Sequence, residues 1–298
     1  MSTYEQEAVG IATLGPVQQT VTEEQATELH STVSAPRARR RRRIRWQRLV
    51  SPLALLGIWQ LSHVFNLISP GHLPPPSLIA TTAVNLITHP TPAYGSLQGA
   101  LLVSLERFAI GFALGGSVAV LLAITAGLSR IGEAAIDPLA QMIRTLPLFG
   151  LIPVFIVWFG IGTLPKVLLV ALGAAVPLYL NTYSGIRSID GRLFELGHVL
   201  GLNRWELLRN VVVPSALPQA LVGLRQSLGA AWLSLVVAEQ INANAGLGFM
   251  INQATQFLRN DVIFVALFTY TLLGLLTDWI VRILERRALA WRTDLVIR

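Results

Sequence analysis

Six long apolar stretches constrain this 298-residue chain more than any other feature of its sequence. Crossing the hydrocarbon core of a bilayer takes about 20 residues of helix, and each stretch is close to that length. Backbone groups in lipid must bond within their own segment, which at these lengths requires helices. The sequence therefore predicts an all-α, polytopic membrane protein with about six transmembrane helices, at residues 49–68, 107–128, 139–160, 167–186, 221–241 and 262–283.

Composition narrows the class further. Charged residues make up only 13% of the chain, about half the share found in soluble domains. The absence of cysteine excludes disulfides, thiolate metal sites and cysteine nucleophiles, and no two histidines have metal-ligand spacing. The only lysine, Lys166, lies between Pro165 and Val167, so the chain lacks the glycine–lysine loop that binds ATP phosphates. We therefore expect a transporter subunit that binds no metal or cofactor and is not an enzyme.

The cations predict the orientation of the chain. Eight of the 23 arginines and lysines lie in residues 37–48, directly before the first predicted span, whereas Lys166 and Arg259 lie in connections of the other side. Cytoplasmic segments carry an excess of such residues, so both termini are predicted to be cytoplasmic in an inner (plasma) membrane protein. The connection 69–98 has six prolines and no cation, and is expected outside. The sequence has no basic face interleaved with stacking aromatic residues, so it does not indicate nucleic-acid binding.

The predicted organisation has three parts. Residues 1–36 contain five acids, no lysine or arginine and no sustained apolar period, as in a disordered tail. We therefore expect a disordered tail at 1–48 that ends in an arginine-rich juxtamembrane run, a transmembrane domain at 49–290 and a cytoplasmic tail at 291–298. Within the second span, Gly111, Gly115 and Ala119 are four residues apart, a stripe that permits close contact between helices.

The connection 188–214, between the fourth and fifth spans, is too polar to cross a membrane. Leu193, Leu196 and Leu200 fall at helical spacing, which predicts a short amphipathic helix that Gly201 ends. Asn203 and Glu206 form a capping-box pattern for a second short helix, which is expected to stop near Pro214. The pattern favours a helical hairpin that a partner's groove grips. A surface hairpin without a partner is the alternative.

The connection also contains Glu195, with Gly201 six residues later, and the run 211–214, Val-Val-Val-Pro. These residues resemble the EAA loop of permease subunits of ATP-binding-cassette importers. The two alanines of that loop are Leu196 and Gly197 here, and valines replace its usual isoleucine and leucine. The resemblance implies that the hairpin docks into a cleft of an ATPase subunit, with a coupling set of Glu195, Gly197, Gly201, Trp205, Val211 and Pro214.

The resemblance extends over about residues 49–290. Segments 144–147, 152–153, 158–162, 181–187 and 242–248 are similar to permeases for aliphatic sulfonates, within a group that also carries taurine and nitrate. It implies a type I importer permease fold and a role in sulfur acquisition, with taurine or nitrate as alternative substrates. It also implies four kinds of partner: a second permease chain, expected as a homodimer, two ATP-binding subunits that hold ATP and Mg²⁺, an extracytoplasmic substrate-binding protein and membrane lipid.

Charged and amide residues in or near the spans are candidates for the substrate pathway. Arg225, Trp232 and Glu239 recur at helical spacing with Gly229 and Val236, so they share one face of the fifth span. A sulfonate has three acceptor oxygens, which arginine, amide and indole donors suit. The predicted pathway set is Arg144, Arg225, Gln226, Trp232, Glu239 and Gln240. The alternative is an internal Arg–Glu or Arg–backbone bond that holds the bundle together.

Two other classes of function are less well supported by the residues. A gradient-driven secondary transporter would place acids at mid-membrane, whereas Glu239 and Asp278 lie near the ends of their spans. An intramembrane enzyme would need a nucleophile and base at depth, yet the only histidine in a span is His63.

Overall fold

The structure, a computed structural model, describes residues 40–67, 69 and 71–290 and contains no β-strand in that part of the chain. Most of the predicted tail at 1–48 and all of the tail at 291–298 lie outside the described residues. Eleven α-helices are found, with a 3₁₀ turn (η1, Leu148–Leu151) and a π-helix (η2, Leu208–Val212). The α-helices are α2 (Arg40–Val64), α3 (Pro76–Thr88), α4 (Leu97–Leu128), α5 (Arg130–Thr145), α6 (Ile152–Phe159), α7 (Thr163–Arg187), α8 (Gly191–Val199), α9 (Arg204–Leu207), α10 (Val213–Gln240), α11 (Leu247–Gln256) and α12 (Asn260–Ala288).

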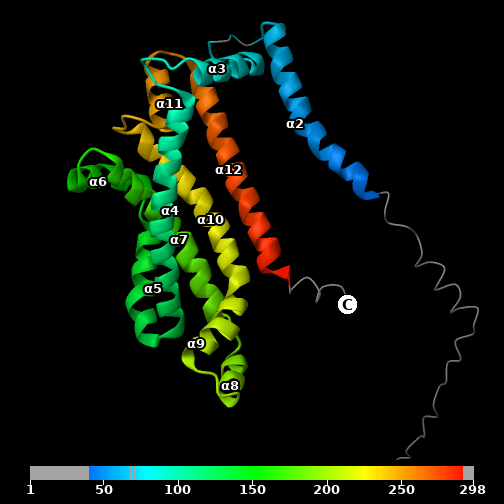
Figure 1. Cartoon of the computed structure of the whole chain (residues 1–298). Helices are drawn as coiled ribbons and strands as arrows, with labels where there is room; N and C mark the ends of the chain where they lie inside the picture. Colours follow the sequence, from blue (N-terminus) through cyan, green and yellow to red (C-terminus); the bar gives the residue numbers. More distant parts are fainter. Residues whose placement is uncertain (1–39, 68, 70, 291–298) are drawn as a thin grey trace, which may run out of the picture. The chain divides into compact units, whose positions relative to one another are not determined.

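Four helical segments of the described chain are long and apolar enough to cross a bilayer. They are α4, α7, the continuous helical run Arg204–Gln240 that includes α10, and α12. These segments contain the second, fourth and sixth predicted spans, and the fifth except for its last residue, 241. The prediction of an all-α, polytopic membrane protein is therefore confirmed (Figure 1).

The third predicted span, 139–160, is not one straight helix. It consists of the end of α5 and the segment Leu148–Phe159, which meet at an angle of 93°. Pro147 disfavours the helical conformation at the residue before it, and Leu146 is accordingly extended, with φ −69° and ψ 135°. Pro153 causes no such break, because it lies in the first turn of α6, where a missing N–H costs little.

The first predicted span is also shorter than expected. The described apolar part of α2, Val50–Val64, falls below the length needed to cross a bilayer, and the helix ends before residue 68. The proline-rich connection 69–98 contains α3, a short apolar helix that the sequence analysis did not predict. Pro76 is in the first turn of α3, where its fixed φ and missing N–H favour a helix start.

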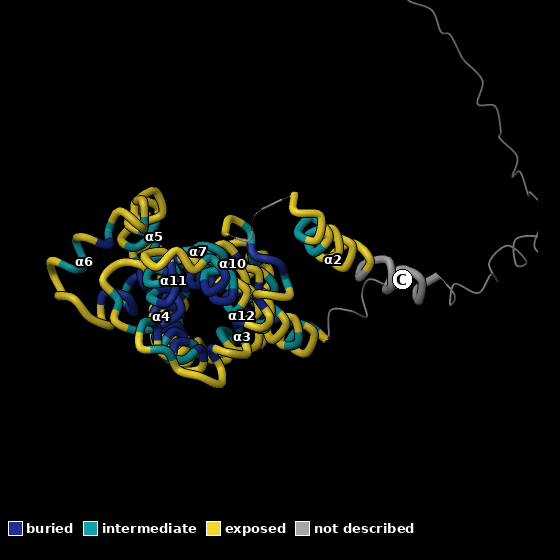
Figure 2. The backbone as a smooth tube through the Cα atoms, turned by 90° about the horizontal axis from the view of Figure 1, so that it is seen from above, coloured by how far each residue is buried: buried dark blue, intermediate teal, exposed yellow. Residues whose placement is uncertain are grey.

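The described chain divides into two compact units, with the boundary between Gly57 and Ile58. Within the second unit, α7 packs most extensively against α4 and α10, and Figure 2 shows the buried positions gathered on these helices and α11. The predicted small-residue stripe on α4 makes this approach possible. A Cβ on Gly115 would lie 2.0 Å from the carbonyl oxygen of Ala171, and one on Gly111 would lie 2.7 Å from that of Val167.

Candidate functional site

The connection between α7 and α10 folds as the predicted helical hairpin, α8 followed by α9 (Figure 1). Asp190 caps α8, because its Oδ1 accepts a hydrogen bond of 3.0 Å from the backbone N–H of Arg192. The predicted capping box of α9 is present. The side chain of Asn203 accepts from the N–H groups of Trp205 and Glu206, while Glu206 Oε2 accepts from the N–H of Asn203 at 2.8 Å. Local sequence chemistry therefore sets both helix starts.

Two glycines shape the turn of the hairpin. Gly201 has φ +72°, the left-handed conformation that glycine adopts without steric cost, and it follows the end of α8 as predicted. Gly197 is buried, and a Cβ there would lie 2.4 Å from Cδ1 of Leu207. Gly197 therefore lets α8 and α9 approach closely, and Gly201 reverses the chain between them.

The outward surface of the hairpin is apolar with a free carboxylate. Leu196, Val199, Leu200 and Trp205 are all exposed, and Trp205 is 68% exposed. Glu195 is exposed, and its carboxylate forms no hydrogen bond or ion pair with the residues that the structure describes. The leucines of the predicted amphipathic helix thus lie on its outer side, while Phe194 packs near Ile186 and Val212. An exposed apolar patch rimmed by polar groups is typical of a protein-binding surface.

The hairpin joins α10 through the π-helix η2, which contains Val211. Pro214 was expected to stop the second short helix, and this expectation is wrong, because the helical run continues from Arg204 to Gln240. Pro214 lies in the first turn of α10, directly after η2. A proline ring clashes with the carbonyl four residues earlier, and the wider turn of a π-helix accommodates this.

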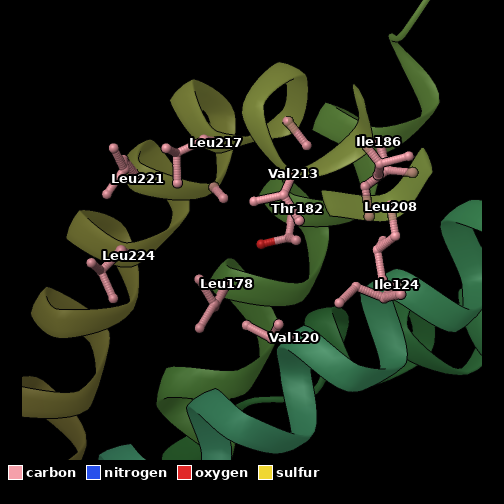
Figure 3. A pocket seen from close by; sticks show the side chains of 13 residues that line it. Val120, Ile124, Leu178, Thr182, Ile186, Leu208, Val213, Leu217, Leu221 and Leu224 are labelled. Carbon is pink, nitrogen blue, oxygen red and sulfur yellow. The ribbon is translucent and has the colours of Figure 1, made fainter. Parts of the chain in front are cut away.

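An apolar cavity of about 290 Å³ lies beside this junction (Figure 3). Side chains of α4, α7, η2 and α10 line it, and the hydroxyl of Thr182, also in the lining, is buried without a hydrogen-bond partner. Val120 and Val213 of its lining are themselves exposed, so the cavity is open to the surface and is not an interior void.

The predicted pathway residues do not lie on one common surface. Arg225 is partly exposed and pairs with Asp278 at 3.2 Å and Glu285 at 2.6 Å, both on α12. Trp232 is buried, stacked on Phe108 at a ring-centroid distance of 3.9 Å. Glu239 is fully buried. The remaining members are exposed, namely Arg144, Gln226 and Gln240.

Glu239 is the centre of a buried polar cluster near the end of α10 remote from the hairpin. Its carboxylate accepts hydrogen bonds from Arg107 at 2.7 Å, from the Ser104 hydroxyl at 2.7 Å and from the Tyr270 hydroxyl at 2.8 Å. It also accepts from the backbone N–H of Gly248 at 3.1 Å. Arg107, in turn, donates to the carbonyl oxygen of Ala245 at 2.7 Å. The cluster thus connects α4, α10, α11 and α12. It contains an internal Arg–Glu bond of the kind that was the alternative to a pathway role for Glu239.

The cluster restricts which residue can stand in the loop before α11. Gly246 has φ +113°, and a Cβ there would lie 2.5 Å from Glu239 Oε1, so only glycine fits. Lys166 is also buried, and its Nζ donates to the carbonyl oxygens of Gly162 and Asn242.

Sequence reasoning missed Ser104, Arg107, Lys166 and Tyr270 as members of the buried polar groups. A usable signal existed, since a buried charge requires a partner and two of these residues are cations in or beside apolar stretches.

Fold and site together define a helical membrane-transport subunit. In the part of the chain that the structure describes, no group of three or more histidine or acidic side chains could hold a metal. The chain matches the family of binding-protein-dependent transport system inner membrane components over residues 115–289. It therefore belongs to that family, the permease subunits of ATP-binding-cassette importers, which are not themselves enzymes.

Individual relatives agree with this family. The chain is 41% identical to a protein named as the aliphatic sulfonates transport permease SsuC of Bacillus subtilis, over 85% of this chain and 91% of the relative. It is 42% identical to the Escherichia coli protein of the same name, over 80% and 89%. The taurine transport system permease TauC of Escherichia coli is 31% identical over 80% of this chain and 87% of the relative.

Solved structures share the fold. An amino acid ABC transporter matches with a TM-score of 0.54 and 17% identity, over 70% of this chain and 97% of that one. The methionine transporter MetNI in an inward-facing conformation matches with a TM-score of 0.50 and 19% identity, over 71% and 96%. At these identities the likeness shows the fold alone, that of an importer permease.

Proposed function

We propose that this chain is the permease through which aliphatic sulfonates are imported. The observation that carries the proposal is the identity of 41–42% with two permeases named for aliphatic sulfonates, over at least 80% of the chain. The taurine permease, named for another sulfonate, is only 31% identical. Taurine is therefore the second candidate substrate.

The α8–α9 hairpin is the proposed coupling site. A separate ATPase subunit, which holds ATP and Mg²⁺, receives the exposed apolar surface around Trp205, and Glu195 supplies a charged contact at its rim. The free carboxylate and the apolar surface support this assignment, because each lacks a partner within the described chain. The hairpin and both termini are cytoplasmic in this proposal, and the complex contains two copies of the permease, two ATPase subunits and one extracytoplasmic binding protein.

The pathway proposal distinguishes the exposed candidates from the enclosed ones. Arg144, Arg225, Gln226 and Gln240 are proposed to contact the aqueous route, since their side chains are exposed. Arg144 lies at the end of α5, where the third predicted span bends, and makes no ion pair with a described residue. Broken helices often line transport sites. Trp232 and Glu239, which are buried, are proposed to hold the helices around the route in place without contacting the substrate.

Competition for uptake tests the substrate. The permease, its ATPase and its binding protein are reconstituted in vesicles, and import of radiolabelled ethanesulfonate is measured against unlabelled alkanesulfonates, taurine and nitrate. Alkanesulfonates should compete at the lowest concentration. Import of taurine or nitrate in preference to ethanesulfonate would overturn the proposed substrate.

A further inference from the structure

Three side-chain amides form a continuous hydrogen-bonded ladder between α7 and α10. Gln219 Nε2 donates to Asn181 Oδ1 at 3.0 Å, and Asn181 Nδ2 donates to Gln226 Oε1 at 2.9 Å. Asn181 Nδ2 also donates to the backbone carbonyl oxygen of Pro177 at 2.8 Å. Both glutamines are exposed, and all three residues lie in the halves of α7 and α10 nearest the hairpin.

The backbone fixes the direction of this ladder. A carbonyl oxygen only accepts, so the contact with Pro177 requires the NH₂ group of Asn181 to point that way. Gln226 must then present its oxygen to Asn181, which leaves both N–H bonds of Gln226 Nε2 without an acceptor among the described residues. Gln219 keeps one further N–H. The free groups of the ladder are therefore mainly donors.

Close helix packing builds the ladder. A Cβ on Gly223 would lie 2.6 Å from Cβ of Asn181, and one on Gly185 would lie 3.0 Å from Cβ of Gln219. Glycine at both positions brings the backbones near enough for amides on α7 and α10 to meet. The ladder is thus held rigidly at the seam of the two helices.

The exposed stripe around the ladder differs from the lipid-type surfaces of this chain. On α10 one row of exposed residues recurs every three or four positions, and four of its six members are polar or small: Ser215, Gln219, Val222, Gln226, Gly229 and Leu233. On α12 the exposed residues Leu272, Leu275 and Trp279 are apolar and each at least 59% exposed. The exposed cations Arg282 and Arg286 follow toward the end of that helix. Unsatisfied amide donors are costly in hydrocarbon, so the α10 stripe faces something other than lipid tails.

We propose that the ladder of Asn181, Gln219 and Gln226 lines the aqueous route and is the contact that selects the anionic head group. This inference rests on the proposed function, since it takes a sulfonate as the passing ion. Sulfonate oxygens accept hydrogen bonds, and the ladder offers donors with no carboxylate among its members. Neutral donors hold an anion weakly, which a transport route requires because the ion must also leave.

The first test places a negative charge at one residue of the ladder, Gln226. Gln226→Glu keeps the size of the side chain but replaces free donors by a negative charge, and should lower ethanesulfonate import by the reconstituted complex roughly tenfold. The matched control is Gln256→Glu, the same change at an exposed amide on α11, which should import at the wild-type rate. If Gln226→Glu imports ethanesulfonate at the wild-type rate, the proposed role of the ladder is wrong. If the wild-type complex does not import ethanesulfonate, the proposed substrate is wrong instead.

The second test does not depend on the substrate. The chain has no cysteine, so Gln226→Cys and Leu272→Cys each introduce a single thiol. In the assembled complex, a charged, water-soluble thiol reagent should modify the cysteine at 226 at least tenfold faster than the one at 272, on the apolar face of α12. Equal rates would overturn the proposal. Spontaneous disulfide formation between two copies at 226, without access of the reagent, would also overturn it, because the stripe would then be a sealed interface.

Discussion

Two glutamates of this permease occupy opposite environments. Glu239 is fully buried and accepts four hydrogen bonds, including one from the guanidinium of Arg107. Glu195 is exposed on the α8–α9 hairpin and has no partner among the described residues. A carboxylate that is fully satisfied inside the chain serves the fold, whereas one left free beside an apolar surface is available to another molecule. The difference separates a residue that holds the bundle together from one that is proposed to meet a partner.

The largest effect should come from removing the charge of the buried glutamate. Glu239→Gln keeps the volume but leaves the charge of Arg107 buried without a counter-ion, which should cost about 3–5 kcal/mol. We expect a clearly lower unfolding midpoint in detergent, measured by thermal denaturation with size-exclusion detection. Glu195→Gln, the same change at the exposed carboxylate, should leave the midpoint unaltered.

A double variant sharpens this prediction. Arg107→Met together with Glu239→Gln removes both charges while keeping an acceptor for Ser104, Tyr270 and the N–H of Gly248. It should be more stable than Glu239→Gln alone, because the buried charge of Arg107 is removed together with its counter-ion. If the single variant unfolds at the wild-type midpoint, the cluster does not hold the bundle together.

The next effect concerns the exposed glutamate. Glu195→Arg should leave the free energy of unfolding within about 0.5 kcal/mol of wild type, as expected for a surface change. Binding of the ATPase subunit should weaken roughly tenfold or more, because a charged contact is reversed. Co-purification and a titration of the ATPase onto the detergent-solubilised permease measure this. Undiminished binding would remove Glu195 from the interface.

The smallest effect should arise at the turn of the hairpin. Gly201 has φ +72° and open space around its Cα, so Gly201→Ala meets only backbone strain, about 1 kcal/mol. Hydrogen exchange of the amides in α8 and α9 should therefore accelerate about fivefold, while exchange in α7 stays the same. Gly201→Asn should accelerate it less, since asparagine tolerates this conformation. Equal exchange in wild type and Gly201→Ala would contradict the assigned role of the turn.

The features that the sequence predicted well depend on local chemistry. Four spans follow from apolar length, and the capping box of Asn203 with Glu206 and the turn at Gly201 follow from residues a few positions apart. Pro147 is itself a local signal for a kink in the third apolar stretch, but the size of the bend, 93°, does not follow from that signal. Each local rule needs only neighbouring residues.

The partners of the charged residues could not be predicted in the same way. Glu239 meets Arg107 and Ser104 from 132 and 135 positions away, so its environment depends on how α4 packs against α10. Helical spacing alone placed Arg225, Trp232 and Glu239 on one face, without saying which neighbouring helix covers each of them. The amide ladder was missed for the same reason, since Asn181 and Gln219 become neighbours only when α7 and α10 pack together.

The most direct test of the central claim, that a separate ATPase drives this permease through the α8–α9 hairpin, uses vesicles with defined contents. Ethanesulfonate uptake is measured with the permease and binding protein, with and without the ATPase subunit, in the presence of ATP, Mg²⁺ and an imposed ion gradient. The account predicts uptake only when the ATPase is present, and its loss with Glu195→Arg. Uptake at the full rate by the permease without any ATPase would contradict it.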